Sequence, residues 1–223
     1  VALRDSLKDP FSNPLRGGYL DRTVLTVSPV LYMVADDNGS ARTIPLSLQM
    51  NRGSWFGGLY VSAQDLDVRG ENEGVSPVVF PSLSNKSLMN RYVAAYAGFP
   101  WKKYDVTLAA SVFYADLEGM DGVELLYSNQ DRLDQEGAFK DIRVGLLKEF
   151  SGRRSFEALF VYHDFNMTHK LESNTWIWDG MNRITEKHID HSRTEGVHLN
   201  YRMPWGRNGW MLGTTATDRK SVV

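Results

Sequence analysis

The five histidines of this chain all fall between residues 163 and 198, among carboxylates, and they are the first candidates for chemistry. His188 and His191 have Glu186 and Asp190 as near neighbours. Imidazole and carboxylate groups together can hold a divalent transition metal. This spacing matches no closed ligand motif, however, and the chain has no cysteine. Scattered histidines on a polar surface segment explain the pattern better, so we predict neither a metal site nor a cofactor.

Ester hydrolysis would need a nucleophilic serine beside a histidine that a third polar group orients. The nearest pair is Ser155 and His163, which are too far apart along one extended segment to touch at about 3.3 Å per residue. Ser173, in a predicted loop, is less constrained. No hydrolase motif surrounds these residues. We therefore assign no catalytic residue and treat a lipid hydrolase as a minor alternative.

Carboxylates are concentrated in residues 116–137, where they could bind calcium or magnesium. Their spacing is not that of a calcium-binding loop, so a solvated loop is the stronger interpretation. The whole chain carries 27 acidic and 25 basic residues, and this near balance argues against a general nucleic-acid binder. The carboxylates in question are Asp116, Glu118, Asp121, Glu124, Asp131, Asp134 and Glu136.

The element that best explains how such side chains are positioned is residues 104–114. Its alternate residues form an apolar face that begins and ends in tyrosine, whereas the other face is mainly small or polar. About ten residues of tilted strand cross a bilayer's hydrocarbon core, and tyrosine favours the two interfaces. The pattern is typical of a transmembrane β-barrel strand, with a half-buried strand of a soluble sheet as the alternative. The apolar face is Tyr104, Val106, Leu108, Ala110, Val112 and Tyr114.

The rest of the chain repeats this pattern between connections of two kinds. Residues 1–22 are predicted to be irregular, and no apolar run is long enough for a transmembrane helix. Short turns alternate with long polar loops, as in outer-membrane barrels with short periplasmic and long extracellular connections. The predicted strands are 23–35, 43–50, 55–63, 91–99, 104–114, 139–150, 155–163, 197–203 and a last one from Trp210; the short turns are 51–54, 100–103, 151–154 and 204–209, and the long loops are 64–90, 116–137 and 164–195.

The two sides of these strands predict two surroundings. Large aromatic residues gather at the short-turn end, as an interfacial girdle would require. The opposite phase collects charged and polar residues, which could line a water-filled lumen or pair to plug a narrow one. The girdle residues are Trp55, Trp101, Tyr104, Phe150, Trp205 and Trp210, with Tyr114 at the far end of its strand. The predicted lumen residues are Asp105, Arg143, Glu149, Glu157, His163, His198, Asn200 and Arg202.

Over residues 23–219 the chain resembles Gram-negative outer-membrane β-barrel proteins as a class. Within it, the segment from Val197 to Gly206 is similar to a hairpin of two-partner secretion transporters, although neither the preceding globular domains nor the lid-loop motif of that family is recognisable. About nine strands are predicted, whereas single-chain bacterial barrels normally have an even number. Residues 221–223 also lack the closing aromatic residue of such barrels. Either a strand within residues 116–137 is missing from this count or the chain is part of a larger barrel, and we favour the second explanation.

The predicted fold is thus all-β, an antiparallel up-and-down transmembrane β-barrel in a bacterial outer membrane. The resemblance implies a channel or translocation pore for solutes or polypeptide. The alternative is a binding or structural module, a plugged barrel or soluble sandwich that presents long polar loops; an outer-membrane lipid hydrolase is the minor one. The expected partners are membrane lipid, lipopolysaccharide or divalent cations at the acidic loops, and a further barrel segment or partner protein.

Overall fold

A computed structural model describes residues 9–33, 40–67, 82–83, 87–119, 132–177, 180–205 and 210–222. In this part of the chain the structure is all-β, as predicted, with two short helical turns near its start. They are α1 (Asp9–Ser12) and the 3-10 helix η1 (Pro14–Tyr19), which lie within the segment predicted to be irregular. No helix among the described residues is long and apolar enough to cross a membrane.

The strands form one sheet in the order β1-β3-β4-β6-β7-β8-β9-β10-β11. Every neighbouring pair on this path is antiparallel, which confirms the up-and-down arrangement. Off the path, β2 pairs with β3 and the short β5 runs parallel to β8. The strands are β1 (Val24–Val27), β2 (Val30–Met33), β3 (Ser40–Asn51), β4 (Phe56–Asp67), β5 (Ser82–Leu83), β6 (Ser87–Trp101), β7 (Val106–Leu117), β8 (Arg132–Phe150), β9 (Arg154–Ile177), β10 (Gly180–Trp205) and β11 (Trp210–Val222).

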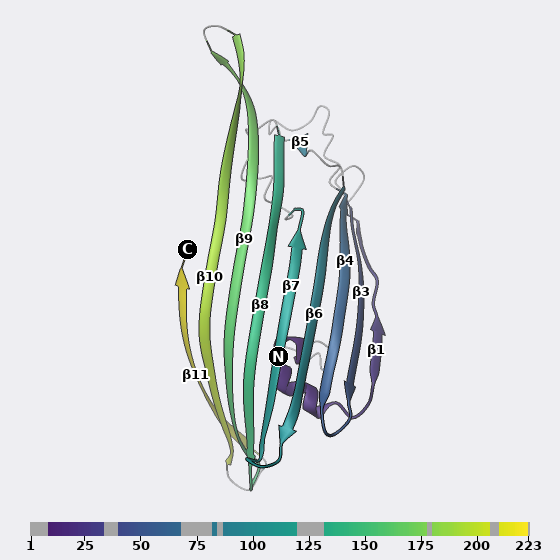
Figure 1. Ribbon diagram of the computed structural model, residues 1–223, viewed down its shortest axis with the longest axis vertical. Helices are drawn as coiled ribbons and strands as arrows, with labels where there is room; N and C mark the ends of the chain where they lie inside the picture. The colour runs from purple at the N-terminus through teal and green to yellow at the C-terminus, as the bar shows by residue number, and fades with distance from the viewer. Residues whose placement is uncertain are drawn as a thin grey trace.

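The sheet is curved, and the N-terminal helical segment lies against one of its faces (Figure 1). Within the described residues it does not close into a barrel, because β1 and β11 are each paired on one side only. The structure therefore shows an open sheet and not a closed barrel, and the expectation that the chain is part of a larger barrel stays a prediction. The reason is topological: with nine antiparallel strands on the path, the first and the last run in the same direction, so they cannot pair antiparallel with each other.

The face turned away from the N-terminal segment, here called the outer face, is apolar and exposed. One row of directly paired residues crosses most of the sheet on this side, from Leu25 through Leu48, Leu59 and Val112 to Ile142. These side chains are between 38% and 67% exposed, far more than a soluble core would leave them. We call this surface the apolar belt; it comprises Leu25, Val27, Ile44, Leu46, Leu48, Leu59, Val61, Val93, Val112, Ile142, Val144, Phe160, Val197 and Leu199.

The opposite side, the inner face, carries the buried core together with polar and small residues. Leu15 of the N-terminal segment is buried against Phe56, Tyr96, Ala109 and Leu147. Around this cluster the inner positions are polar: Ser47, Gln49, Ser62, Ser111 and Asp141 are also buried. These buried polar groups thus lie on the face opposite the apolar belt.

Several strands extend beyond their predicted bounds, such as β6, which covers 87–101 where the sequence predicts 91–99, and two other differences have a local reason. The strand expected over residues 104–114 begins at Val106, because Tyr104 and Asp105 belong to the turn and Asp105 has φ 53°. The single strand expected over residues 23–35 is divided into β1 and β2, both on β3, at Ser28 and Pro29. Proline has no N–H to give to a ladder, which accounts for the break.

The long loop predicted over residues 164–195 is wrong. β9 and β10 stay in register through this region, from Ser155 opposite Arg202 to Ile177 opposite Gly180. β8 likewise begins at Arg132, inside the predicted loop 116–137. The apolar alternation fades here while threonine and isoleucine, which favour extended backbone, persist. Of the predicted loops 64–90 and 116–137, residues 68–81, 84–86 and 120–131 lie outside the described part, and the remaining residues belong mainly to the ends of β4 and β7, to β5 and to the starts of β6 and β8.

Candidate inner-face site

All the predicted lumen residues except Asp105 lie on the inner face. The register places Arg143 beside Ser111 and Val161, and it places Glu157 beside Asn200. Alternation along each strand then puts the others on the same side. The inner-face residues are Arg143, Glu149, Glu157, His163, His198, Asn200 and Arg202, whereas Asp105 is exposed in the β6–β7 turn.

Three inner-face side chains, Arg143, Asp141 and His163, converge between β8 and β9. Arg143 donates two hydrogen bonds to the carboxylate of Asp141, with Nε–Oδ1 2.8 Å and Nη2–Oδ2 2.7 Å. His163 Nδ1 lies 2.9 Å from the same Oδ2, and its ring stacks on Phe139 at 5.9 Å between centroids. Asp141 is only 6% exposed, so the bidentate arginine supplies the compensation that a buried carboxylate needs.

Sequence reasoning missed Asp141, although a signal was available. Asp141 stands two residues before Arg143 and therefore shares its face in any strand. Its pairing with His163 across β8 and β9 depends on the register, which the sequence alone does not give.

Two inner-face glutamates are taken up by the N-terminal segment. Glu157 accepts a hydrogen bond from Asn13 Nδ2 at 2.8 Å and forms an ion pair with Arg16 at 3.3 Å. Glu149 accepts a hydrogen bond from the Tyr19 hydroxyl at 2.8 Å. Burial, together with this hydrogen bond to Glu149, raises the pKa of Tyr19 to about 12. The phenol is therefore protonated and able to donate at neutral pH.

The serine and histidine candidates do not meet. Ser155 and His163 occupy the same strand, β9, and at about 3.3 Å per residue their eight intervening steps span roughly 26 Å. Ser173 lies further along that strand, opposite Ile184. The arrangement around His163 therefore contains a carboxylate but neither of the proposed nucleophiles.

The histidines form separate pairs with carboxylates rather than a common site. His169 Nε2 lies 3.1 Å from Asp190 Oδ2, and His191 Nε2 lies 3.1 Å from Asp164 Oδ1. His188 is directly opposite His169 and lies 3.4 Å from Glu186, but His191 points to the other face because it is an odd number of residues away. Within the residues that the structure describes, no three potential ligands are close enough to hold a metal ion.

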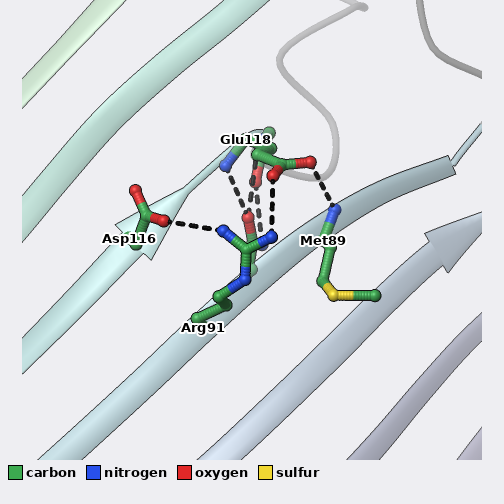
Figure 2. Close-up of polar contacts among 6 residues, drawn as sticks. Met89, Arg91, Asp116 and Glu118 are labelled. Atoms are coloured by element: carbon green, nitrogen blue, oxygen red, sulfur yellow. Dashed lines mark hydrogen bonds and ion pairs between the residues drawn. The ribbon is translucent and has the colours of Figure 1, made fainter.

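The acidic residues that can be placed are partly neutralised by arginine. Arg91 on β6 pairs with Asp116 at 3.0 Å and with Glu118 at 3.5 Å, and the Met89 backbone N–H donates to Glu118 (Figure 2). A cavity of about 380 Å³ lies beside them, lined also by Leu133, Asp134, Gln135, Glu136, Thr168 and Lys170. Asp121, Glu124 and Asp131 lie outside the described residues.

The predicted girdle residues are exposed where their side chains are described. Trp101 and Tyr104 meet edge to face at the β6–β7 turn, with ring centroids 4.7 Å apart. Tyr114 is at the other end of β7, and Trp205 and Trp210 are paired in the backbone register of β10 and β11. The exposed fractions are Trp55 47%, Trp101 44%, Tyr104 50%, Phe150 40% and Tyr114 38%.

Comparison with known proteins gives no relative: no family model, no curated protein and no solved structure matches the chain.

Proposed function

We propose that this chain forms the wall of a bacterial outer-membrane β-barrel, which provides a polar path for solutes or polypeptide. The observation that supports this most strongly is the division of the sheet into two faces. Exposed aliphatic residues cover the outer face over seven strands or more, whereas buried serine, glutamine, asparagine and aspartate occupy the inner face. Such a sheet suits lipid on one side and water on the other.

Closure of this barrel requires strands that the described sheet does not contain. Because β1 and β11 run in the same direction, antiparallel pairing at both edges needs an odd number of added strands. The total is then even, as in bacterial single-chain barrels. We propose that a further barrel segment or a partner protein supplies these strands, and that membrane lipid covers the apolar belt.

A rival function is a plugged barrel or another binding module. The N-terminal segment favours it, because α1 and η1 occupy the inner face and contact Glu149, Glu157 and Arg143 there. This arrangement leaves open whether the path conducts in the resting state, so flux must be measured rather than inferred from the polar lining.

The membrane placement can be tested with single cysteines, since the natural chain has none. Leu199→Cys and Asn200→Cys are adjacent on β10 but belong to the outer and inner faces, respectively. In reconstituted lipid vesicles we expect a water-soluble, membrane-impermeant thiol reagent to label Asn200→Cys and to spare Leu199→Cys. Ile189→Cys, which is also on the outer face but beyond the belt, is the positive control.

Labelling of Leu199→Cys as fast as the Ile189→Cys control would overturn the membrane placement. The polar path is tested separately in the same vesicles, by the release of an entrapped small sugar. Vesicles that hold correctly oriented protein and still retain the sugar under every condition would argue for the binding module.

A further inference from the structure

The N-terminal segment fits the inner face so closely that the two surfaces form a peptide and its receptor. We infer that the inner face carries a peptide-binding recess, that residues 9–20 are its resident ligand, and that the polar path is closed while they are seated. This inference rests on the proposed function for the path, but the recess itself is an independent claim. We call residues 9–20 the plug.

The apolar part of the recess accommodates one leucine. Leu15 is 1% exposed, and the wall makes room for it with Gly145, where an added Cβ would lie 2.9 Å from Leu15 Cγ. The plug in turn has a glycine, Gly17, next to the Tyr96 ring, where an added Cβ would clash with the ring. Phe11 completes the contact by packing edge-on against Tyr96, with centroids 5.1 Å apart. Small residues on each side thus match bulky ones on the other.

The polar part of the recess satisfies charges and backbone groups of the plug. Glu157 receives both Asn13 and Arg16, and its side chain is only 14% exposed. Arg143 donates to the Ser12 carbonyl while it holds Asp141. The mostly buried carboxylate of Glu157 contacts an amide and a guanidinium of one short segment. This makes it a specific site, because the carboxylate would lose both partners if the segment left.

The C-terminal end of the plug is held by wall residues on two different strands. Asn51 of β3 donates to the Gly18 and Leu20 carbonyls, both at 2.9 Å. Glu149 of β8 accepts from Tyr19. Together with the contacts to β4, β6, β7 and β9, the plug bridges six neighbouring strands, so its position spans the inner surface rather than one edge.

The plug depends on contacts with the wall for its structure, so we expect it to leave the recess as one unit. Its regular structure is one four-residue helix and one six-residue 3-10 helix, lengths that are not stable alone in water. Its local order comes from Asn13, whose Oδ1 accepts from the Leu15 N–H, and from Pro14 at the start of the 3-10 helix. Contacts with the wall therefore supply its remaining stability, and weakening them should release it.

A reversible cross-link tests the recess and its effect on flux together. In Leu15→Cys/Gly145→Cys, the sulfur of residue 15 takes the place of Leu15 Cγ, 2.9 Å from the Cβ at 145. That separation suits a disulfide. We expect oxidant to close the pair readily in vesicle-embedded protein, and sugar release to rise several-fold when the bond is reduced. Each single-cysteine variant controls for the substitution.

A second pair of variants keeps the test decisive if Gly145→Cys impairs folding. Glu157→Gln removes the carboxylate that holds Asn13 and Arg16, and it should raise sugar release several-fold. Glu195→Gln is the matched control, since the Glu195 carboxylate pairs with Arg193 of its own strand, β10, and lies on the outer face in phase with Val197; its sugar release should match that of the unmodified protein. Synthetic peptide of residues 9–20 added to Glu157→Gln at high concentration should not restore closure, whereas the same peptide added to a Leu15→Ala variant should.

The outcomes separate the two claims. Release that is the same in the oxidised, reduced and Glu157→Gln proteins, from vesicles that do leak, would overturn the plug and leave the path standing. A cysteine pair that does not cross-link in folded protein would overturn the recess. Rapid cross-linking without release in any state would overturn the path, while the seated segment would remain established.

Discussion

The lower and upper halves of β9 and β10 share one ladder but face different surroundings. In the lower half, the outer face carries Phe160, Val197 and Leu199, all part of the apolar belt. In the upper half, here called the upper hairpin (residues 164–177 and 180–193), the same phase carries Thr168, Lys170 and Glu172 on β9. Strand pairing continues across the change without a break. Backbone pairing therefore continues regardless of side-chain type, whereas the outer face changes from apolar to polar along the strands, as it would if lipid surrounded the lower half only.

The difference between the two halves is tested most strongly by placing one positive charge on the outer face of each. Val144 in the belt and Ile189 in the upper hairpin are β-branched residues on the outer face, 52% and 59% exposed. Arginine at Val144 should cost about 2–4 kcal/mol if lipid surrounds the belt. Arginine at Ile189 should stay within about 0.5 kcal/mol, because water already solvates that position. Urea unfolding of both variants from lipid vesicles measures the difference.

If the chain is instead part of a soluble β-sandwich, a different result is expected for the arginine variants at Val144 and Ile189. Both side chains are exposed in the isolated chain, so without a membrane the two arginines should be tolerated equally. Equal small penalties in vesicles would therefore reject the membrane placement, even if the strands are all correct.

The contrast also explains which parts of the fold could be predicted from sequence. Alternation of aliphatic residues identified the strands wherever one face meets an apolar medium, as in Ile44, Leu46 and Leu48 of β3. It failed above the belt, where the outer face of the upper hairpin is mainly polar and apolar residues such as Met167 and Leu171, both buried, stand on the inner face. Residue type gives a second signal for strands in this region, since Thr185, Ile189 and Thr194 favour extended backbone.

The sequence predicts which face of its strand each site residue occupies, but not which site residues contact one another. Alternation placed Glu157, His163 and Arg202 on one face, because that property is local. Which of them would touch depends on register between strands and on the plug, and neither is encoded within a single strand. The N-terminal residues gave no periodic signal because their order comes from the wall: Leu15 is buried by four residues that are distant in sequence.

The second prediction compares carboxylates that each contact a histidine. Asp141 on the inner face is buried and binds Arg143 through two hydrogen bonds, whereas Asp164 in the upper hairpin lies 3.1 Å from His191 and directly opposite Arg193. Asp141→Asn should cost about 1.5–3 kcal/mol, the loss of a charge-assisted contact at a buried site. Asp164→Asn should cost about 0.2–1 kcal/mol, as for an ion pair near water.

Equilibrium unfolding at two salt concentrations checks this pair. Added salt should shrink the Asp164→Asn effect and leave the Asp141→Asn effect nearly unchanged, because screening acts mainly on solvated charges. Comparable losses at the two positions would mean that the upper hairpin is more protected than its exposure indicates.

The smallest expected effect lies at the border between lipid and water. Tyr104 occupies the β6–β7 turn, 50% exposed, at the short-turn end of the belt. An arginine there should cost about 0–1 kcal/mol from its position in the bilayer, because the penalty for a charge falls toward the interface. The substitution also removes the ring that meets Trp101 edge to face at 4.7 Å, and such a pair contributes about 0.5–1.5 kcal/mol.

Tyr104→Ala separates these two terms, since it removes the ring without adding a charge. The difference between Tyr104→Arg and Tyr104→Ala should then fall between the results at Ile189 and Val144, and close to the former. A gradient of this kind follows depth in a bilayer. If the difference at Tyr104 instead equals the full Val144 penalty, the belt extends past the turn, and the interface must lie beyond the short-turn end of the sheet.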